Sequence, residues 1–259
     1  MKRSDLICEN GVINDKDSYD FVHKFALSRT KCTEINVDKA MSDAIGKPIG
    51  RYVTIFCDEG CYGDAFTKIL SDFISNGKAL VAGLGNERIC SDSLGSKSLR
   101  FIPATAHLAK SEEFHDLGLR EVFVIGTSVK GKTGIESTEQ IKCIADMVGA
   151  DFVIAIDSLA CSETERLCNT IQITNSGIAP GAGIGNNRME LNKNTIGRDV
   201  IAIGVPTIID FEGSSSPLMV TPRGIDIIVD EFSEIIGHGI SRALNPSLSA
   251  DELKALTIR

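Results

Sequence analysis

Two aspartates, Asp92 and Asp157, have the residue type and the placement that a pair of catalytic carboxyl groups requires. Asp157 directly follows the apolar run "FVIAI", and Asp92 lies in the loop that leaves "ALVAGL". In open parallel sheets, catalytic groups gather beyond the carboxyl ends of the strands, so adjacent strands would bring both carboxyl groups into one crevice. Two such groups share a proton; the ionised member can activate water while the protonated member polarises a peptide carbonyl. This arrangement would support peptide hydrolysis of the aspartic type.

Each aspartate alone also has a simpler interpretation. Asp92 could cap the segment that begins at Ser93, and Asp157 could cap the turn within "SLACSETER". Serine and cysteine protease arrangements are disfavoured, because the four histidines lie outside the strand-end loops. Cys57 and Cys61 form the closest cysteine pair but have no further clustered ligands, so a zinc site is disfavoured.

A glycine-rich turn precedes the first of these aspartates. Gly83 and Gly85 allow a sharp bend after the strand that leads to Asp92. A dinucleotide-binding turn would carry a third glycine where Arg88 stands, so nucleotide binding is disfavoured. We therefore assign Gly83, Gly85 and Asn86 to a substrate cleft.

A second glycine-rich loop, "SGIAPGAGIGNNR", spans residues 176–188. It could present backbone N–H groups to a carbonyl or an anion, and a plain long turn would explain the same composition. Glu136 is a further candidate for the cleft, although Thr133, three residues before it, favours a helix capping box. The residues of the second loop that we assign to the cleft are Gly181, Gly183, Gly185 and Asn186.

The composition indicates one globular domain over residues 1–259, because this length is near the upper limit for a single core. The net charge of −8 argues against a duplex DNA binder, which normally presents a basic patch. No apolar run is long enough to span a membrane, and the N-terminus lacks the apolar segment of a signal peptide. We therefore expect a cytoplasmic protein with reduced cysteines and no membrane partner.

Short apolar runs that alternate with amphipathic stretches must position these residues. The alternation predicts an α/β fold, with a mostly parallel sheet flanked by helices on both faces. Residues 211–218 are expected to form a connector. The predicted strands are 52–56, 79–84, 121–127, 151–157, 170–174 and 199–210, and the predicted helices are 62–75, 134–149, 224–244 and a short one after a capping pattern at Ser249 and Glu252.

Several long stretches resemble, in order, the germination protease family of spore-forming bacteria, whose members are atypical aspartic endopeptidases. By motif position, the resemblance implies that Asp92 and Asp157 are the catalytic pair. It also implies a fold similar to that of hydrogenase-maturation endopeptidases, no metal or organic cofactor, and a homo-oligomer, commonly a tetramer. The matching stretches are "DAIGKPIGRYVTI", "VAGLGNERICSDSLG", "KTGIES", "DFVIAIDSLA", "TIQITNSGIAPGAGIGNNR", "VIAIGVPTIID" and "LMVTPRGIDIIVDEF".

The resemblance further implies a substrate and a place of action. Family members degrade the small acid-soluble proteins that coat spore DNA, which implies action in the forespore or spore core and no direct nucleic-acid partner. The stretch "RSDLICE" resembles the region where family zymogens cut themselves. This similarity implies autoprocessing near Asp5 and Leu6, with residues 1–5 as a short pro-segment.

The chain departs from the family pattern in three places. Ala179 stands where members usually carry a histidine, Glu87 stands where they have a tryptophan, and only "FEGSSSP" replaces a longer insertion. Two other functions therefore stay open. One is a maturation endopeptidase that recognises a metal on its substrate, and the other is a catalytically silent paralogue that binds spore proteins.

Overall fold

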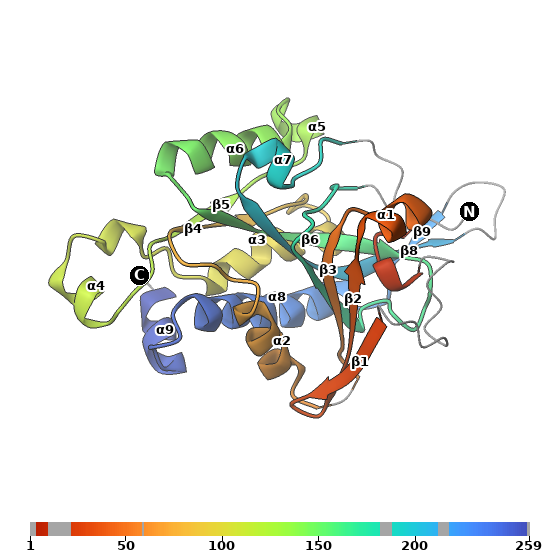
Figure 1. The fold of residues 1–259 in the computed structure, drawn as a ribbon, viewed down its shortest axis with the longest axis horizontal. Coiled ribbons are helices and arrows are strands. Elements are labelled where there is room, and N and C mark those ends of the chain that lie inside the picture. The colour runs from red at the N-terminus through yellow and green to blue at the C-terminus, as the bar shows by residue number, and fades with distance from the viewer. Residues whose placement is uncertain (1–3, 10–21, 59, 182–187, 212–217, 258–259) are drawn as a thin grey trace.

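A mixed β-sheet runs through the centre of the molecule (Figure 1). The computed structural model describes residues 4–9, 22–58, 60–181, 188–211 and 218–257. Within these residues the sheet has nine strands in the order β1-β2-β3-β7-β8-β6-β4-β5, and β9 pairs with β8. The strands are β1 Val22–Leu27, β2 Thr30–Val37, β3 Gly50–Phe56, β4 Ala79–Gly83, β5 Val122–Gly126, β6 Phe152–Cys161, β7 Thr170–Thr174, β8 Asp199–Phe211 and β9 Leu218–Val220.

Helices lie on both sides of this sheet, with α6 and α7 on one side and α2, α3 and α8 on the other (Figure 1). These helices are α2 Tyr62–Ser71, α3 Leu94–Ser98, α6 Ser137–Val148, α7 Lys193–Ile196 and α8 Ile225–Leu244. The other helical segments are η1 Ile7–Glu9, α1 Lys39–Ile45, η2 Cys90–Asp92, η3 Leu99–Phe101, η4 Ala106–Leu108, α4 Glu112–Asp116, α5 Lys130–Thr133 and α9 Ala250–Thr257. In the part of the chain that the structure describes, no helix is both long and apolar enough to cross a membrane.

The central strand β6 is buried on both faces. Ile154 and Ile156 belong to the core that contains Ile236 of α8, whereas Val153 belongs to the core that contains Ile141 of α6. Because successive side chains of a strand point to opposite faces, a continuous apolar run is what such a strand requires. This run is the feature that identified the strand in the sequence.

The prediction of a mostly parallel sheet is wrong. Parallel pairing among the described strands joins only β4, β5, β6 and β8, and the other pairings are antiparallel. One reason is chain length: only residues 162–169 separate β6 from β7, too few for the crossover that a parallel strand needs. The other reason is the β1–β2 hairpin, whose turn places Ser28 and Arg29 at φ values of 52° and 62°. Its turn lacks the Asn-Gly type of signal that marks a hairpin in a sequence.

Two capping predictions had different outcomes. Before α9, Ser249 N–H donates to Glu252 Oε2 at 2.8 Å and Glu252 N–H donates to Ser249 Oγ at 3.3 Å, which confirms that capping box. The capping box predicted for Thr133 and Glu136 is wrong, because Glu136 is itself the N-cap of α6 and pairs with Glu139. Thr133 lies at the end of α5 instead, where its hydroxyl donates to the carbonyl of Ile135 at 3.0 Å.

The N-terminal segment of residues 4–9 is packed firmly into the molecule. Leu6, Ile7 and Cys8 are at most 3% exposed and share a cluster with Leu159 of β6. Ile7 N–H donates to Gln172 Oε1 of β7 at 3.1 Å. This segment therefore packs against β7 and against the part of β6 that follows Asp157.

Candidate active site

The structure brings Asp92 and Asp157 to one cavity of about 310 Å³. The strands that carry them, β4 and β6, are adjacent and parallel, with Gly83 opposite Ile156. Asp157 is the next residue of β6, and Asp92 ends the short helix η2 that follows β4. The two side chains therefore meet in one cavity, as expected, just beyond the carboxyl end of β4, although Asp157 itself lies inside β6, which continues to Cys161.

The glycine turn after β4 holds the Asp92 loop in place. Gly85 has a φ of +95°, and a Cβ on this residue would lie 2.2 Å from the carbonyl oxygen of Asp92. Asn86 N–H donates to Asp92 Oδ2 at 2.9 Å. The interpretation of Asp92 as a cap of the next helix is wrong, because its carboxylate accepts from the turn and Ser93 is the N-cap of α3.

Gly83 and Gly95 allow the helix α3 to pack closely against the strands. A Cβ on Gly83 would lie 2.4 Å from the carbonyl oxygen of Gly95, and a Cβ on Gly95 would lie 2.4 Å from the N atom of Leu84. These contacts bring α3 directly against β4 and the end of β6. The glycines thus place two stretches of backbone against each other.

Asp157 sits in a more apolar environment than Asp92. It is 4% exposed within β6, and its Oδ1 accepts from Ser158 N–H at 3.0 Å. The prediction that Asp157 caps a turn is wrong, because β6 continues to Cys161. Burial raises the pKa of Asp157 well above its usual range, and the nearby carboxylates of Asp92 and Asp5 raise it further.

Asp92 is only partly buried, and burial raises its pKa as well. The Asn86 N–H and the positive charge of Arg188 oppose that rise in pKa by stabilising the ionised carboxylate. As the pH rises, Asp92 is therefore the first of the two to lose its proton. The pair can hold one ionised and one protonated carboxyl group.

Sequence reasoning missed Arg188 as a member of the site. It lines the cavity with both aspartates, and its charge acts to lower the pKa of each. The signal available in the sequence was its position at the end of the second glycine-rich loop. A cation next to a candidate oxyanion loop can stabilise negative charge that develops on the substrate.

Asp5, expected only as a cleavage position, also lines the cavity. Its N–H donates to the carbonyl of Ala160 at 2.9 Å, and its Oδ2 accepts from Ala160 N–H at 2.8 Å. Its neighbour Leu6 is 1% exposed and packs in the adjacent apolar cluster. No local pattern connects residues 5 and 160, so the sequence offered no signal for this contact.

The remaining candidates divide into four groups. Gly85 and Gly181 line the cavity, whereas Gly83 and Asn86 support it from the turn. Glu136 forms an ion pair with Lys130 at 2.9 Å and is not among the lining residues; the next residue of α6, Ser137, is. The predicted cleft residues that lie outside the described residues are Gly183, Gly185 and Asn186.

The described residues that line the cavity include no histidine. Across the described parts of the chain, no three His, Cys, Asp or Glu side chains are grouped so that they could hold a metal ion. Ala179, at the position where a histidine was expected from the resemblance, lines a neighbouring cavity. The ionisable side chains that line the cavity are the carboxyl groups of Asp5, Asp92 and Asp157 and the guanidinium of Arg188.

Comparison with known proteins points to one family. A family model described as germination protease matches residues 14–216. The chain is 32% identical to a germination protease of Clostridium perfringens, with 97% of each chain covered, and 34% identical to one of Clostridium tetani, with 90% of each covered. It is 37% identical to a germination protease of Bacillus cereus over 88% of this chain and 66% of that one. Among solved structures, a [NiFe] hydrogenase maturation protease of Thermococcus kodakarensis matches 68% of this chain and 98% of that one, with 17% identity and a TM-score of 0.40.

Proposed function

Because this chain belongs to the germination protease family, a family of peptidases, we propose that it is an aspartic-type endopeptidase. Its substrates are the small acid-soluble spore proteins, which it degrades during germination in the spore core. The observation that carries this proposal is the single cavity lined by Asp92 and Asp157. The different environments of the two carboxyl groups support a division of roles between them.

In the proposed mechanism, ionised Asp92 accepts a proton from a water molecule, whose oxygen attacks the peptide carbonyl carbon. Protonated Asp157 gives its proton to the carbonyl oxygen, which forms a neutral tetrahedral intermediate. When this intermediate breaks down, the amine leaves with the proton held on Asp92, and a hydroxyl proton returns to Asp157. The products are a carboxylic acid and an amine, and the pair regains its starting state.

Arg188 and the loop at Gly181 have supporting roles in this proposal. The guanidinium keeps the pKa of Asp92 low enough for the base to be ionised when Asp157 is protonated. Gly181 lies on the cavity wall, where backbone donors could meet the developing charge on the carbonyl oxygen. No metal or organic cofactor enters the reaction.

The proposal extends to processing and assembly. Residues 1–5 act as a short pro-segment, and the chain cuts itself at the Asp5–Leu6 bond. The position of Asp5 on the cavity wall supports this assignment. The working form is a homo-oligomer of single peptidase domains, a tetramer by similarity to the family.

Replacing either aspartate by asparagine tests the proposed reaction. We expect Asp92→Asn and Asp157→Asn each to lower kcat by several orders of magnitude, because coupled catalytic residues act as a unit. The measurement is the cleavage of a purified small acid-soluble spore protein, with fragments mapped by mass spectrometry. Asp199→Asn is the matched control, since Asp199 is exposed and begins β8 at the opposite end of the strands. Cleavage by Asp157→Asn at the rate of the control would refute the mechanism, and no cleavage by the unmodified chain would refute the function.

A further inference from the structure

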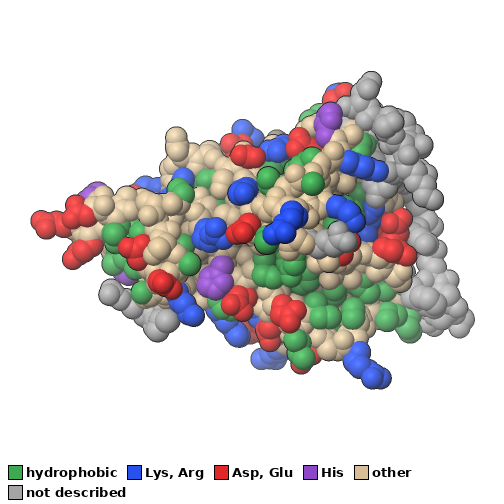
Figure 2. Space-filling model, turned by 90° about the horizontal axis from the view of Figure 1, so that it is seen from below, with side chains coloured by type: hydrophobic (Ala, Val, Ile, Leu, Met, Phe, Trp, Pro, Cys, Tyr) green, Lys and Arg blue, Asp and Glu red, His purple; other side chains and the backbone are tan. Residues whose placement is uncertain are grey.

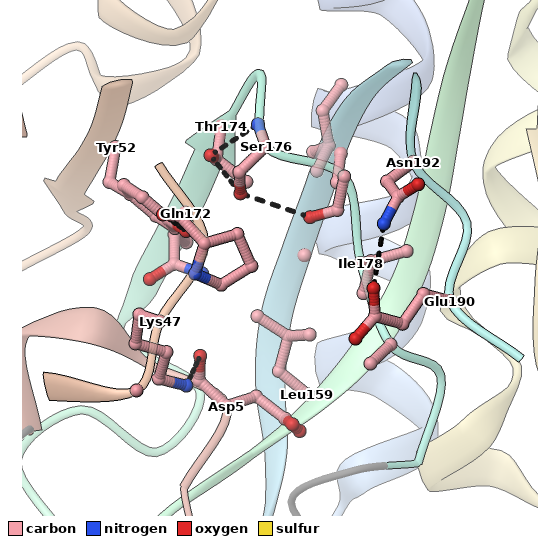
Figure 3. Close-up of a pocket in the computed structure, with 17 residues that line it drawn as sticks. Asp5, Lys47, Tyr52, Leu159, Gln172, Thr174, Ser176, Ile178, Glu190 and Asn192 are labelled. Atoms are coloured by element: carbon pink, nitrogen blue, oxygen red, sulfur yellow. Dashed lines mark hydrogen bonds between the residues drawn. The ribbon is translucent and has the colours of Figure 1, made fainter. Parts of the chain in front are cut away.

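A second cavity, of about 260 Å³, adjoins the one that holds the two aspartates. It is lined by Leu159 of β6, Tyr52 of β3 and Thr174 of β7, among others (Figure 3). Asp5 lines both cavities. The two cavities are therefore separated at this point by one residue of the N-terminal segment.

The backbone of Ser4 and Asp5 is held there as a bound peptide would be held. Asp5 N–H donates to the carbonyl of Ala160 at 2.9 Å. From the other side, Lys47 Nζ donates to the carbonyl oxygen of Asp5 at 3.1 Å and to that of Ser4 at 3.3 Å. In Figure 3 the Lys47 ammonium reaches the Asp5 backbone, while the Asp5 carboxylate points away from it.

The carbonyl of Ala160 and the ammonium of Lys47 contact backbone atoms of Ser4 and Asp5, and these contacts do not depend on the side chains at the two positions. The Asp5 carboxylate adds a contact of its own with Ala160 N–H. Ala160 belongs to the part of β6 that extends beyond Ile156, the last residue that pairs with β4. Chain ends and extended peptides bind at such strand edges through main-chain hydrogen bonds. Lys47 adds charge-assisted donors, which form stronger hydrogen bonds with carbonyl oxygens than neutral donors do.

Lys47 is also held in one place by its surroundings. It follows Gly46, which ends α1 at a φ of 68°, and it precedes Pro48, whose carbonyl accepts from the Tyr52 hydroxyl at 2.8 Å. It is the one cation among the described residues that line the second cavity. Its hydrogen bonds in the described structure go to carbonyl oxygens of Ser4 and Asp5.

We propose that Lys47 is a peptide-binding residue, which donates to the backbone carbonyls of a substrate on the N-terminal side of the bond to be cut. The second cavity then receives a side chain from that part of the substrate. This inference rests on the proposed endopeptidase function, because Ser4 and Asp5 precede the bond at which self-cleavage is proposed. A substrate supplied in solution takes the place of Ser4 and Asp5 on Ala160 and Lys47.

The test measures binding separately from cleavage. The chain that begins at Leu6, which is the form that the proposed self-cleavage would leave, is prepared with Asp157→Asn and titrated with a purified small acid-soluble spore protein. Its Kd is compared with that of the same chain carrying Lys47→Met in addition. We expect Kd to rise about tenfold to a hundredfold, since a hydrogen bond to a charged donor is lost. Lys47→Arg keeps a positively charged donor, so its Kd should be closer to that of the parent chain than to that of Lys47→Met. The control is Lys39→Met, which changes an exposed lysine of α1 that pairs with Asp43.

In chains with intact Asp157, the inference predicts that Lys47→Met raises KM and leaves kcat nearly unchanged. An unchanged Kd and KM in Lys47→Met, with a melting temperature equal to that of the control, would overturn the role of Lys47 while the endopeptidase function stands. A fall in kcat alone would overturn it as well. If the unmodified chain neither binds nor cleaves the spore protein, both proposals fail together.

Discussion

The chemistry proposed for this molecule depends on the difference between two carboxyl groups that line one cavity. Asp157 lies within a buried strand, whereas Asp92 lies on a loop and accepts a backbone N–H. Burial therefore raises the pKa of Asp157 more than that of Asp92. Two carboxyl groups of equal pKa would be less suited to divide the tasks of base and acid.

Asp157→Asn should change the pH dependence of stability. A carboxyl group whose pKa is raised in the folded state contributes stability that is fully present below its unfolded pKa, about 3.9, and is lost as the pH rises through the folded pKa. Asparagine does not ionise, so its variant does not lose this stability. The free energy of unfolding of Asp157→Asn, relative to that of the unmodified chain, should therefore increase as the pH rises from about 4. Urea unfolding at several pH values measures this difference. A difference that stays constant with pH would mean that the pKa of Asp157 is not raised.

Arg188→Met should move the acid limb of the pH–activity profile to higher pH. The guanidinium favours ionised Asp92, so its removal raises the pKa of that base and a higher pH is needed to ionise it. We expect the acid limb to move up by about one pH unit, so that kcat/KM falls about tenfold at any pH on that limb. Arg100→Met, at an exposed position of η3, serves as the control. If the acid limb of the pH–activity profile lies at the same pH in Arg188→Met and in the unmodified chain, Arg188 has no part in the proposed mechanism.

At the scale of elements, the turn after β4 determines whether Asp92 reaches the cavity. Gly85 adopts a conformation that side chains rarely take, and its α-carbon faces the backbone of Asp92. Gly95 allows α3 to pack against the strand ends from the other direction. The site therefore depends on close backbone contacts in addition to its carboxyl groups.

Gly85→Ala should lower the free energy of unfolding by about 1–3 kcal/mol, because the positive φ strains any residue with a Cβ. The added Cβ also collides with the Asp92 carbonyl, so kcat should fall with stability. Gly131→Ala is the matched control, since a Cβ there meets nothing within 4 Å. Chemical unfolding and the cleavage assay together measure both effects. Full activity in Gly85→Ala would show that the turn does not position Asp92.

At the scale of the whole molecule, one face of the protein presents a group of hydrophobic side chains. Hydrophobic side chains gather on one face toward the end that carries the β1–β2 hairpin (Figure 2). Hydrophobic residues that remain partly exposed while packed on the main core include Phe25, Leu27 and Tyr62. Large exposed apolar patches typically mark interaction sites. This face is a suitable interface for the proposed homo-oligomer.

Size-exclusion chromatography with light scattering tests that assembly. We expect the unmodified chain to run as an oligomer and Phe25→Asp to shift the population to smaller species, because a buried charge at an interface is unfavourable. Met147→Asp, at a 76% exposed position of α6 in the opposite layer, should leave the mass unchanged. A monomeric unmodified chain would contradict the oligomer, and an unchanged Phe25→Asp oligomer would place its interface elsewhere.

Much of this architecture could be predicted before the structure. The apolar runs of β3, β4, β7 and β8 were recognised to within two residues at their ends, and α8 was predicted to within one residue. The strand predicted to end at Asp157, β6, continues to Cys161. Asp92 and Asp157 were selected by their positions after two such runs. These features are local, because burial on both faces of a strand requires a continuous apolar stretch that can be recognised in a single segment.

Only the tertiary structure decided which distant segments meet. The positions of Asp5 against Ala160, of Lys47 on the Asp5 carbonyl and of Arg188 beside two aspartates depend on contacts between residues far apart in the chain. The antiparallel half of the sheet was also missed, since the strand order is set by how the whole chain packs. The sequence alone therefore determined the buried strands and the two candidate carboxyl groups, because periodicity and residue type are properties of single segments. Folding decided the environment of those groups, because burial and charge depend on every segment that packs around them.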